Sequence, residues 1–170
     1  MKQVSWLFLL AIILTAGCVH KTPITTDHTI EIDPQLIGLW ESIAGEAKDD
    51  PDEDRMLVLK WSETEFLAQL PMGAKGEFYR AYLVEIGGRT LLQAESVGNS
   101  VGRQFPTDRM SYPVLSYELV EGILILSTLN PEVVDEEIAD SAALRQAYLE
   151  NKDKPGLFNP PAHFRKVQDQ

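Results

Sequence analysis

The sequence predicts a mainly β domain of the α+β class: an antiparallel meander curled into a partial or closed barrel, with one or two helices inserted before the last strand. Short segments alternate apolar and polar side chains at the two-residue period of a strand. Gly87-Gly88 and Glu121-Gly122 are tight-turn dipeptides, so the segments on either side of each should pair as hairpins. Helical signals come late, just ahead of a final short segment with strand character.

The strands are expected between these turns. The segment 64–70 alternates most clearly, with Phe66, Ala68 and Leu70 on one face. The segment 123–129 contains Ile-Leu-Ile-Leu, which is apolar on both faces, so we expect it to be a central strand. In chain order, the predicted strands are 38–42, 55–61, 64–70, 77–86, 89–97, 113–120, 123–129 and 162–167.

One or two helices are expected before the last strand. Asn130-Pro131 resembles an N-cap followed by proline at the first helical position, and acidic residues follow near the positive end of the helix dipole. A second helix should begin at Asp140 or Ser141 and end before Pro155-Gly156. We expect this insertion to cover one opening of the barrel. The buried side of the second helix would carry Leu144, Tyr148 and Leu149.

The first seventeen residues have the layout of a secretory signal. Lys2 gives a positive start, and residues 4–17 are uncharged. This run is about 14 residues long, whereas a helix needs about 20 to span a membrane. Cys18 follows as the single cysteine of the chain, so it has no disulfide partner within it. The alternatives are a cleaved signal followed by a free thiol, and a lipid attached to Cys18.

The segment Leu14-Thr15-Ala16-Gly17-Cys18 resembles the lipobox of bacterial lipoprotein precursors. The resemblance implies cleavage before Cys18, lipidation of Cys18 by diacylglycerol and palmitate-type chains, and anchoring in the cell envelope. Thr15 stands where the family usually has leucine, and Leu14 lies one position earlier. Each buried methylene adds about 0.8 kcal/mol of membrane affinity, so several chains hold such a protein permanently. Val19, in place of the family's retention aspartate, favours the outer membrane, at its periplasmic face in a Gram-negative cell.

Three parts of the chain are predicted. Residues 1–17 form the signal peptide, residues 18–33 the lipidated cysteine and a flexible tether, and residues 34–170 a single β-rich globular domain. The tether is polar, rich in threonine and without a hydrophobic period, and a flexible coil of this length reaches about 20 Å.

The chain is acidic, with 26 Asp and Glu against 15 Lys and Arg and a net charge of −11. Such a field repels nucleic acid and anionic head groups, which excludes functions that depend on a basic patch. The sequence therefore indicates no nucleic-acid partner.

Gly38-Leu39-Trp40 resembles the Gly-x-Trp motif of lipocalins and other calycins. The resemblance implies that Trp40 closes the barrel floor and that Arg165, in the last strand, stacks on its ring. A cation–π contact of this kind contributes about 1–2 kcal/mol. Lipocalins carry their helix after the eighth strand, whereas here the helices precede the last one. The alternative is that Trp40 is an ordinary core residue at the start of a sheet.

Two further features are candidate binding elements. Arg80 shares a face of its strand with Phe78 and Tyr82. If that face is the interior, Arg80 would meet an anionic ligand, and otherwise it would pair with one of the many carboxylates. The segment 98–112 is a long polar connection that we expect to form a recognition loop. Its candidate contact residues are Phe105 and Met110.

No motif for a metal site, a cofactor or catalysis is found. Asp50, Asp52 and Asp54 have the alternate spacing of a calcium loop, but Arg55 and Trp61 stand where its glycine and bidentate glutamate belong. His20, His28 and His163 have no second ligand at zinc-binding spacing. We find no nucleophile elbow and no phosphate-binding glycine loop.

The sequence thus favours a non-enzymatic envelope lipoprotein whose β domain binds another envelope component, expected to be a protein. The alternative is a calycin-like carrier of a small hydrophobic ligand, held by Trp40, Arg80 and Arg165. A third hypothesis is an envelope hydrolase that uses paired carboxylates.

Overall fold

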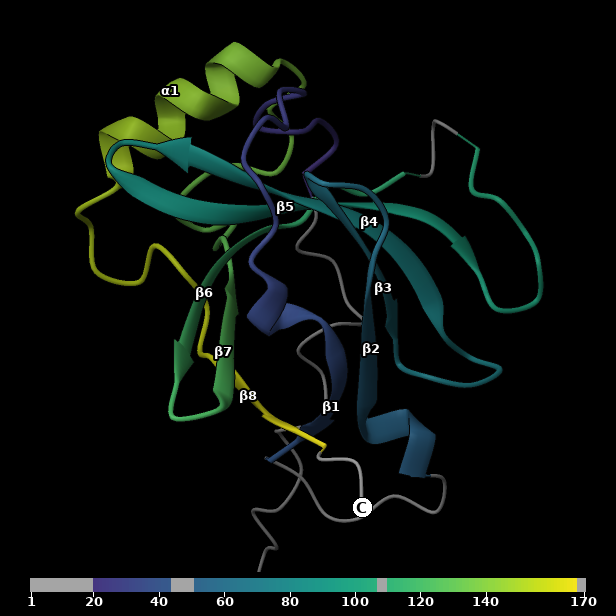
Figure 1. Ribbon diagram of the computed structural model, residues 1–170. Helices are drawn as coiled ribbons and strands as arrows, with labels where there is room; N and C mark the ends of the chain where they lie inside the picture. Colours follow the sequence, from purple (N-terminus) through teal and green to yellow (C-terminus); the bar gives the residue numbers. More distant parts are fainter. Residues whose placement is uncertain (1–19, 44–50, 107–109, 168–170) are drawn as a thin grey trace, which may run out of the picture.

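The computed structural model describes residues 20–43, 51–106 and 110–167. Eight antiparallel strands close into a barrel in the order β1 to β8, and a single α-helix precedes β8 in this part of the chain (Figure 1). The predicted fold class is confirmed, and the barrel is closed. The elements are η1 (Pro34–Leu36), β1 (Gly38–Ser42), η2 (Pro51–Asp54), β2 (Arg55–Lys60), β3 (Glu65–Leu70), β4 (Glu77–Ile86), β5 (Arg89–Asn99), β6 (Val114–Val120), β7 (Ile123–Thr128), α1 (Ser141–Asn151) and β8 (Ala162–Lys166).

Pairing of the first strand with the last closes the barrel. β1 pairs with β2 on one side and with β8 on the other, with Trp40 opposite Met56 and opposite Lys166. Each strand therefore has two neighbours, which removes the exposed edges that invite aggregation. Every predicted strand is present, with ends that differ by a residue or two.

The interior of the barrel holds one hydrophobic core. Because side chains alternate across a strand, Ala81 and Leu83 of β4 point inward and Tyr82 and Val84 point outward. The short helix η1 brings Leu36 over one end of this core. The buried residues inside are Leu36, Trp40, Met56, Val58, Phe66, Ala81, Leu83, Ala94, Leu115, Leu124 and Phe164.

A second hydrophobic core lies outside the barrel. The outward side chains of β4 and β5 pack against Leu144 and Tyr148 of α1, both of which are fully buried. The Asp140 side chain caps the helix by accepting a hydrogen bond from Ala143 N at 2.8 Å. Leu144 and Tyr148 are thus buried as predicted, and Leu149 is partly buried. The helix, however, covers the outer face of the barrel at the β4–β5 hairpin, where we expected it to cover an opening (Figure 1).

The helix predicted after Asn130-Pro131 does not form. Residues 131–138 form turns instead. The Asn130 and Asp135 side chains each accept a hydrogen bond from the backbone N–H two residues later, at 3.0 and 2.9 Å. Such local side-chain bonds favour turns over helix. Several acidic residues within one helical turn would also repel one another.

The tether prediction is wrong for residues 20–33, which pack against the barrel. His20 and Ile24 are each 1% exposed. Tyr112 N donates to His20 O at 3.0 Å, and Ile32 N donates to Glu63 O at 3.0 Å. We call residues 20–33 the N-terminal strap. Cys18 lies outside the described residues.

The buried His20 side chain should make stability depend on pH. Burial lowers its pKa below the ordinary value of 6.5, against the opposing influence of Val134 O, Glu136 and Asp135. The unfolded chain then binds a proton more readily than the folded chain, so stability falls as the pH drops below 6.5. Between about pH 7.5 and 5.5, wild type should lose more unfolding free energy in urea than His20→Gln. Equal losses would contradict burial of a neutral imidazole.

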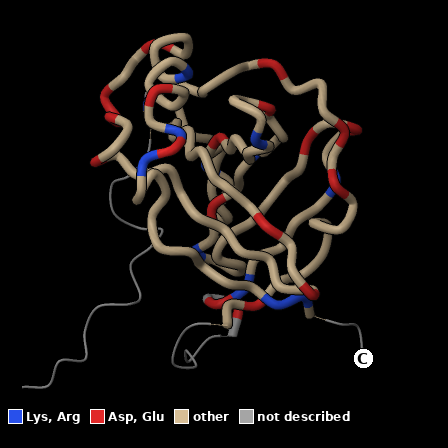
Figure 2. Tube along the Cα trace, turned by 90° about the vertical axis from the view of Figure 1, so that its left-hand side faces the viewer, with Lys and Arg blue, Asp and Glu red and all other residues tan. Residues whose placement is uncertain are grey.

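Acidic positions are spread around the whole trace rather than gathered on one side (Figure 2). The charge surplus seen in the sequence, with a net charge of −11, therefore does not define a single acidic face. An apolar depression that carries positive charge would therefore differ clearly from the rest of this surface.

Candidate functional site on the outer face of the barrel

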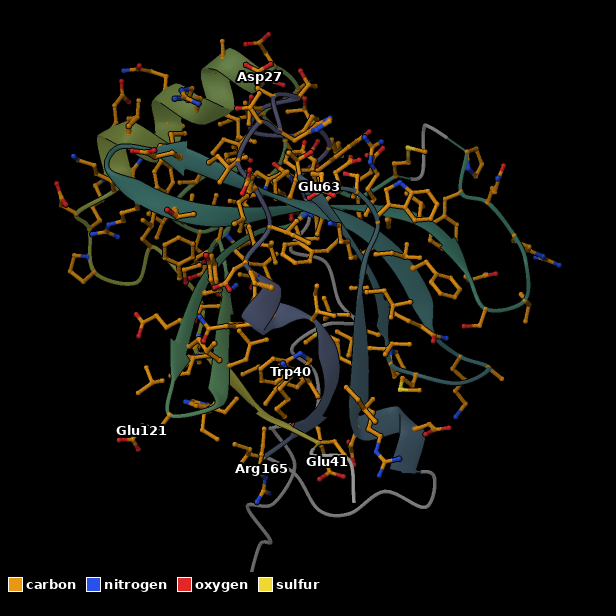
Figure 3. The ribbon with its side chains drawn as sticks, in the orientation of Figure 1. Asp27, Trp40, Glu41, Glu63, Glu121 and Arg165 are labelled. Carbon is orange, nitrogen blue, oxygen red and sulfur yellow. The ribbon has the colours of Figure 1, made fainter. Side chains whose placement is uncertain are left out.

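Trp40 lies at the floor of the barrel, but Arg165 does not stack on it. Trp40 is fully buried, and its Nε1–H donates to Leu36 O at 2.9 Å. Arg165 is exposed and stands opposite Glu41 in the β1–β8 pairing, and both side chains lie beyond Trp40 at the barrel end (Figure 3). Lys166 takes the expected place, with Nζ 5.3 Å from the ring centroid. The single-residue difference arises because alternate side chains of β8 face opposite sides.

Gly38 of the Gly-x-Trp motif makes room for this lysine. Its φ of +141° is one that other residues rarely adopt, and an added Cβ would lie 2.7 Å from Lys166 Cε. The Lys166 Nζ also donates to Gln35 O at 2.9 Å, which links β8 to the helix η1. The motif therefore has a structural role at the barrel floor.

Replacement of Lys166 should test whether its ammonium group, rather than Arg165, stabilises the Trp40 ring. We expect Lys166→Met to lower the free energy of unfolding by about 1 kcal/mol, because it removes the cation from the Trp40 ring. Arg165→Met, at the neighbouring exposed position, should change it by less than about 0.5 kcal/mol. Urea denaturation followed by circular dichroism would measure both. A larger loss of unfolding free energy for Arg165→Met than for Lys166→Met would instead support a contact between Arg165 and the Trp40 ring.

Arg80 points out of the barrel and pairs with a carboxylate. Its guanidinium Nε donates to Glu65 of β3, whose side chain is 9% exposed against 39% for Arg80. His28 of the N-terminal strap adds a contact to Glu65, with Nε2 3.8 Å from Oε1, and its ring centroid lies 5.2 Å from that of Tyr82. Trp40, Arg80 and Arg165 therefore lie in different places and line no common cavity.

A groove lies on the outer face next to Arg80. It has a volume of about 490 Å³, is a shallow depression largely open to solvent, and is lined mainly by apolar surface. Side chains of β3, β4 and β5 form its floor, and the start of the β5–β6 connection forms a wall. The lining residues are Trp61, Leu67, Phe78, Arg80, Val97, Gly98, Asn99, Gly102, Arg103 and Gln104.

The groove is the part of this outer face that the described residues leave uncovered. Tyr82 and Val84 of β4 lie beneath the N-terminal strap and α1, whereas Phe78 and Arg80 of the same strand line the groove. Beyond the floor, Leu59 of β2 stands opposite Leu67 and is 44% exposed. Trp61 is 63% exposed. The bare area is thus continuous from β2 to β5.

The 98–112 loop contributes a wall, although not through the residues expected. Gly98 and Gln104 form an isolated bridge, and Phe105 N donates to Val97 O at 3.3 Å, so the first residues of the loop fold back along β5. An added Cβ on Gly98 would lie 2.7 Å from Arg103 O, so this close approach needs glycine. Phe105 and Met110 are partly buried and do not line the groove.

Two guanidinium groups stand in the groove. Arg80 uses Nε for Glu65, and its group remains partly exposed. Arg103 is exposed, and no carboxylate among the described residues pairs with it. A guanidinium without an internal partner presents a planar set of donors that suits a carboxylate from another molecule. The groove therefore combines apolar surface with an available positive charge.

Trp61, Leu67, Phe78 and Arg103 were not singled out from the sequence, although a signal for some of them exists. In β2, Met56 and Val58 point inward, so Leu59, and Trp61 just after the end of the strand, occupy the positions that are usually polar. Apolar residues on both faces of a strand indicate that the outer face is covered or binds something. Arg103 carried no such signal, because a loop has no period to read.

A second depression of about 410 Å³ lies at the end of α1. It is lined by Arg89, Lys152, Lys154 and the backbone around Gly156, and Arg89 pairs with Asp153 at 3.8 Å. Its charged groups are exposed on long side chains, so it offers weaker apolar contact than the groove.

The chemistry of the described residues gives no other candidate centre. No three His, Cys, Asp or Glu side chains in these parts of the chain are placed to hold a metal ion. No described helix is both long and apolar enough to cross a membrane. Comparison with known families, curated proteins and solved structures finds no match. The function is therefore inferred from the sequence and from the geometry of the groove.

Proposed function

We propose that the protein is a non-enzymatic lipoprotein of the cell envelope and that its barrel is a binding module for another envelope component. The observation that carries the binding role is the bare apolar groove on an otherwise acidic protein, with Trp61 63% exposed beside it. Tryptophan and arginine dominate the binding energy of protein interfaces, and both line this groove. The proposed partner is a protein.

The packing of the barrel interior favours binding at the outer groove over binding of a ligand inside the barrel. Trp40 and Phe66 are almost fully buried in the interior core and pack with the other inward side chains. A calycin-like carrier needs open apolar space of several hundred Å³ where these side chains lie. The carrier hypothesis therefore has less support than surface binding.

The anchoring half of the proposal rests on the signal-like N-terminus and Cys18. Because His20 is already buried in the fold, acylated Cys18 would be separated from it by Val19 alone. Two residues span at most about 7 Å, so the barrel would be held against the membrane rather than on a long tether. Labelled palmitate should be incorporated into wild type and not into Cys18→Ser. Equal labelling of both chains would refute lipidation at Cys18.

The binding half can be tested in living cells by site-specific photo-crosslinking. A photoreactive phenylalanine analogue replaces Trp61 or Phe78 in the groove, and Val120 in a matched control. Val120 is 49% exposed at the end of β6, away from the groove. We expect a discrete cross-linked protein from the two groove positions and none from the control. Absence of any adduct at Trp61 and Phe78 would count against the binding role.

A further inference from the structure

We infer that the occupant of the groove is an extended polypeptide segment that carries an apolar side chain and one carboxylate, with the carboxylate bound by Arg103. This inference rests on the proposed function and adds the chemistry of the partner. It follows from three properties of the groove: its apolar floor, the Arg103 guanidinium that no described carboxylate pairs with, and its shallow, largely open shape.

The floor fits apolar side chains. Leu67, Phe78 and Val97 present hydrocarbon from three neighbouring strands, and Trp61 adds a large exposed ring. Covering such surface is favourable by about 25 cal/mol per Å² of apolar area. A volume of about 490 Å³ accommodates a few side chains rather than a whole domain.

Arg103 supplies the specificity for a carboxylate. Its guanidinium has no acidic partner among the described residues, whereas Arg80 nearby is held by Glu65. Arginine binds carboxylates through paired, charge-assisted hydrogen bonds. The net charge of −11 would repel a strongly acidic partner at long range, so we infer a single carboxylate next to apolar residues.

The shape favours a chain over a membrane surface or a small molecule. The apolar surface is a depression, whereas a lipid surface is best contacted by protruding side chains. Small-molecule sites usually enclose most of their ligand, but this groove is shallow and largely open to solvent. An extended segment can lie in the groove and continue beyond it.

The test selects peptides without assuming the partner. The full chain, in phosphatidylcholine nanodiscs, is exposed to a phage-displayed library of random heptapeptides. We expect enriched sequences to combine apolar residues with one Asp or Glu. Synthetic copies are then titrated by tryptophan fluorescence. Only Trp40 and Trp61 lie outside the signal-like segment, and Trp61 is the exposed reporter.

A double-mutant cycle then tests the proposed ion pair. Replacing the peptide's acid by its amide, or Arg103→Gln in the protein, should each weaken binding by about tenfold or more. The two changes together should cost little more than either alone, because they remove the same contact. Arg145→Gln is the matched control, since Arg145 is an exposed arginine on α1 that does not line the groove. It should leave affinity unchanged.

The inference has clear contrary outcomes. It is overturned if selection enriches no acidic residue, if Arg103→Gln binds as well as wild type, or if the two changes are additive. It is also overturned if Trp61 responds to phosphatidylglycerol vesicles and to no peptide, which would identify the groove as a membrane contact. If cross-links form in cells but the library yields no enriched peptide, the proposed binding function is retained and the extended peptide segment is rejected as the occupant of the groove.

Discussion

Replacing Trp40 with alanine is expected to lower the free energy of unfolding by about 3–5 kcal/mol, the usual cost of emptying a large aromatic site in a core. Trp40 is fully buried at the barrel floor, where β1 meets β8. The change would remove apolar contacts inside the barrel and the surface under the Lys166 ammonium group. It would also leave Leu36 O without its buried hydrogen-bond donor.

Two companion variants separate these contributions. Trp40→Phe keeps most of the apolar volume but lacks the Nε1–H group, so we expect a smaller loss of about 1–3 kcal/mol for the unpaired carbonyl. Trp61→Ala is the matched control, because that ring is 63% exposed, and it should change stability by less than about 0.5 kcal/mol. Urea denaturation followed by far-ultraviolet circular dichroism measures all three. Similar losses for Trp40→Ala and Trp61→Ala would contradict the assignment of Trp40 to the core.

The barrel was predictable because its signals are local. Gly87-Gly88 joins β4 to β5 and Glu121-Gly122 joins β6 to β7, and each turn fixes the pairing of the strands beside it. A succession of such hairpins leaves few arrangements other than a meander. Pairing of β1 with β8 joins segments far apart in the sequence, so the sequence could indicate a partial or a closed barrel but could not decide between them.

Two of the failed predictions involve contacts between distant segments, and the third is local. Residues 20–33 have no strand or helix period, yet Ile24 fills a space between α1 and the outer face of the barrel. Arg165 and Lys166 are adjacent cations, and only the β8 register decides which one lies over Trp40. The turns at residues 131–138 form where a capping pattern predicted helix, since local side-chain bonds competed with it.

The candidate site could be predicted only in part. The 98–112 loop was expected to take part in recognition, and its first residues do form a wall of the groove. The sequence allows Arg80 to face either the interior or the exterior, and the alternation of β4 places it outside with Glu65. The groove itself depends on where the N-terminal strap stops covering the barrel, which no local pattern encodes.

Ile24→Ala is expected to lower the free energy of unfolding by about 2–5 kcal/mol, although Ile24 lies in a segment that the sequence predicts to be a flexible tether. The side chain is 1% exposed and belongs to the core formed by β4, β5 and α1. Its backbone N–H donates to Gln93 Oε1 at 2.7 Å, and Gln93 is itself fully buried. The strap therefore satisfies a buried amide as well as covering apolar surface.

The same urea denaturation distinguishes a packed strap from a free tether. Thr26→Ala is the control within the segment, because Thr26 is exposed, and its expected change is below about 0.5 kcal/mol. A free tether would make both substitutions neutral. Loss of stability at Ile24 alone would mean that the strap is packed against the barrel by residue 24, so the proposed lipid on Cys18 would have only a short link to the barrel.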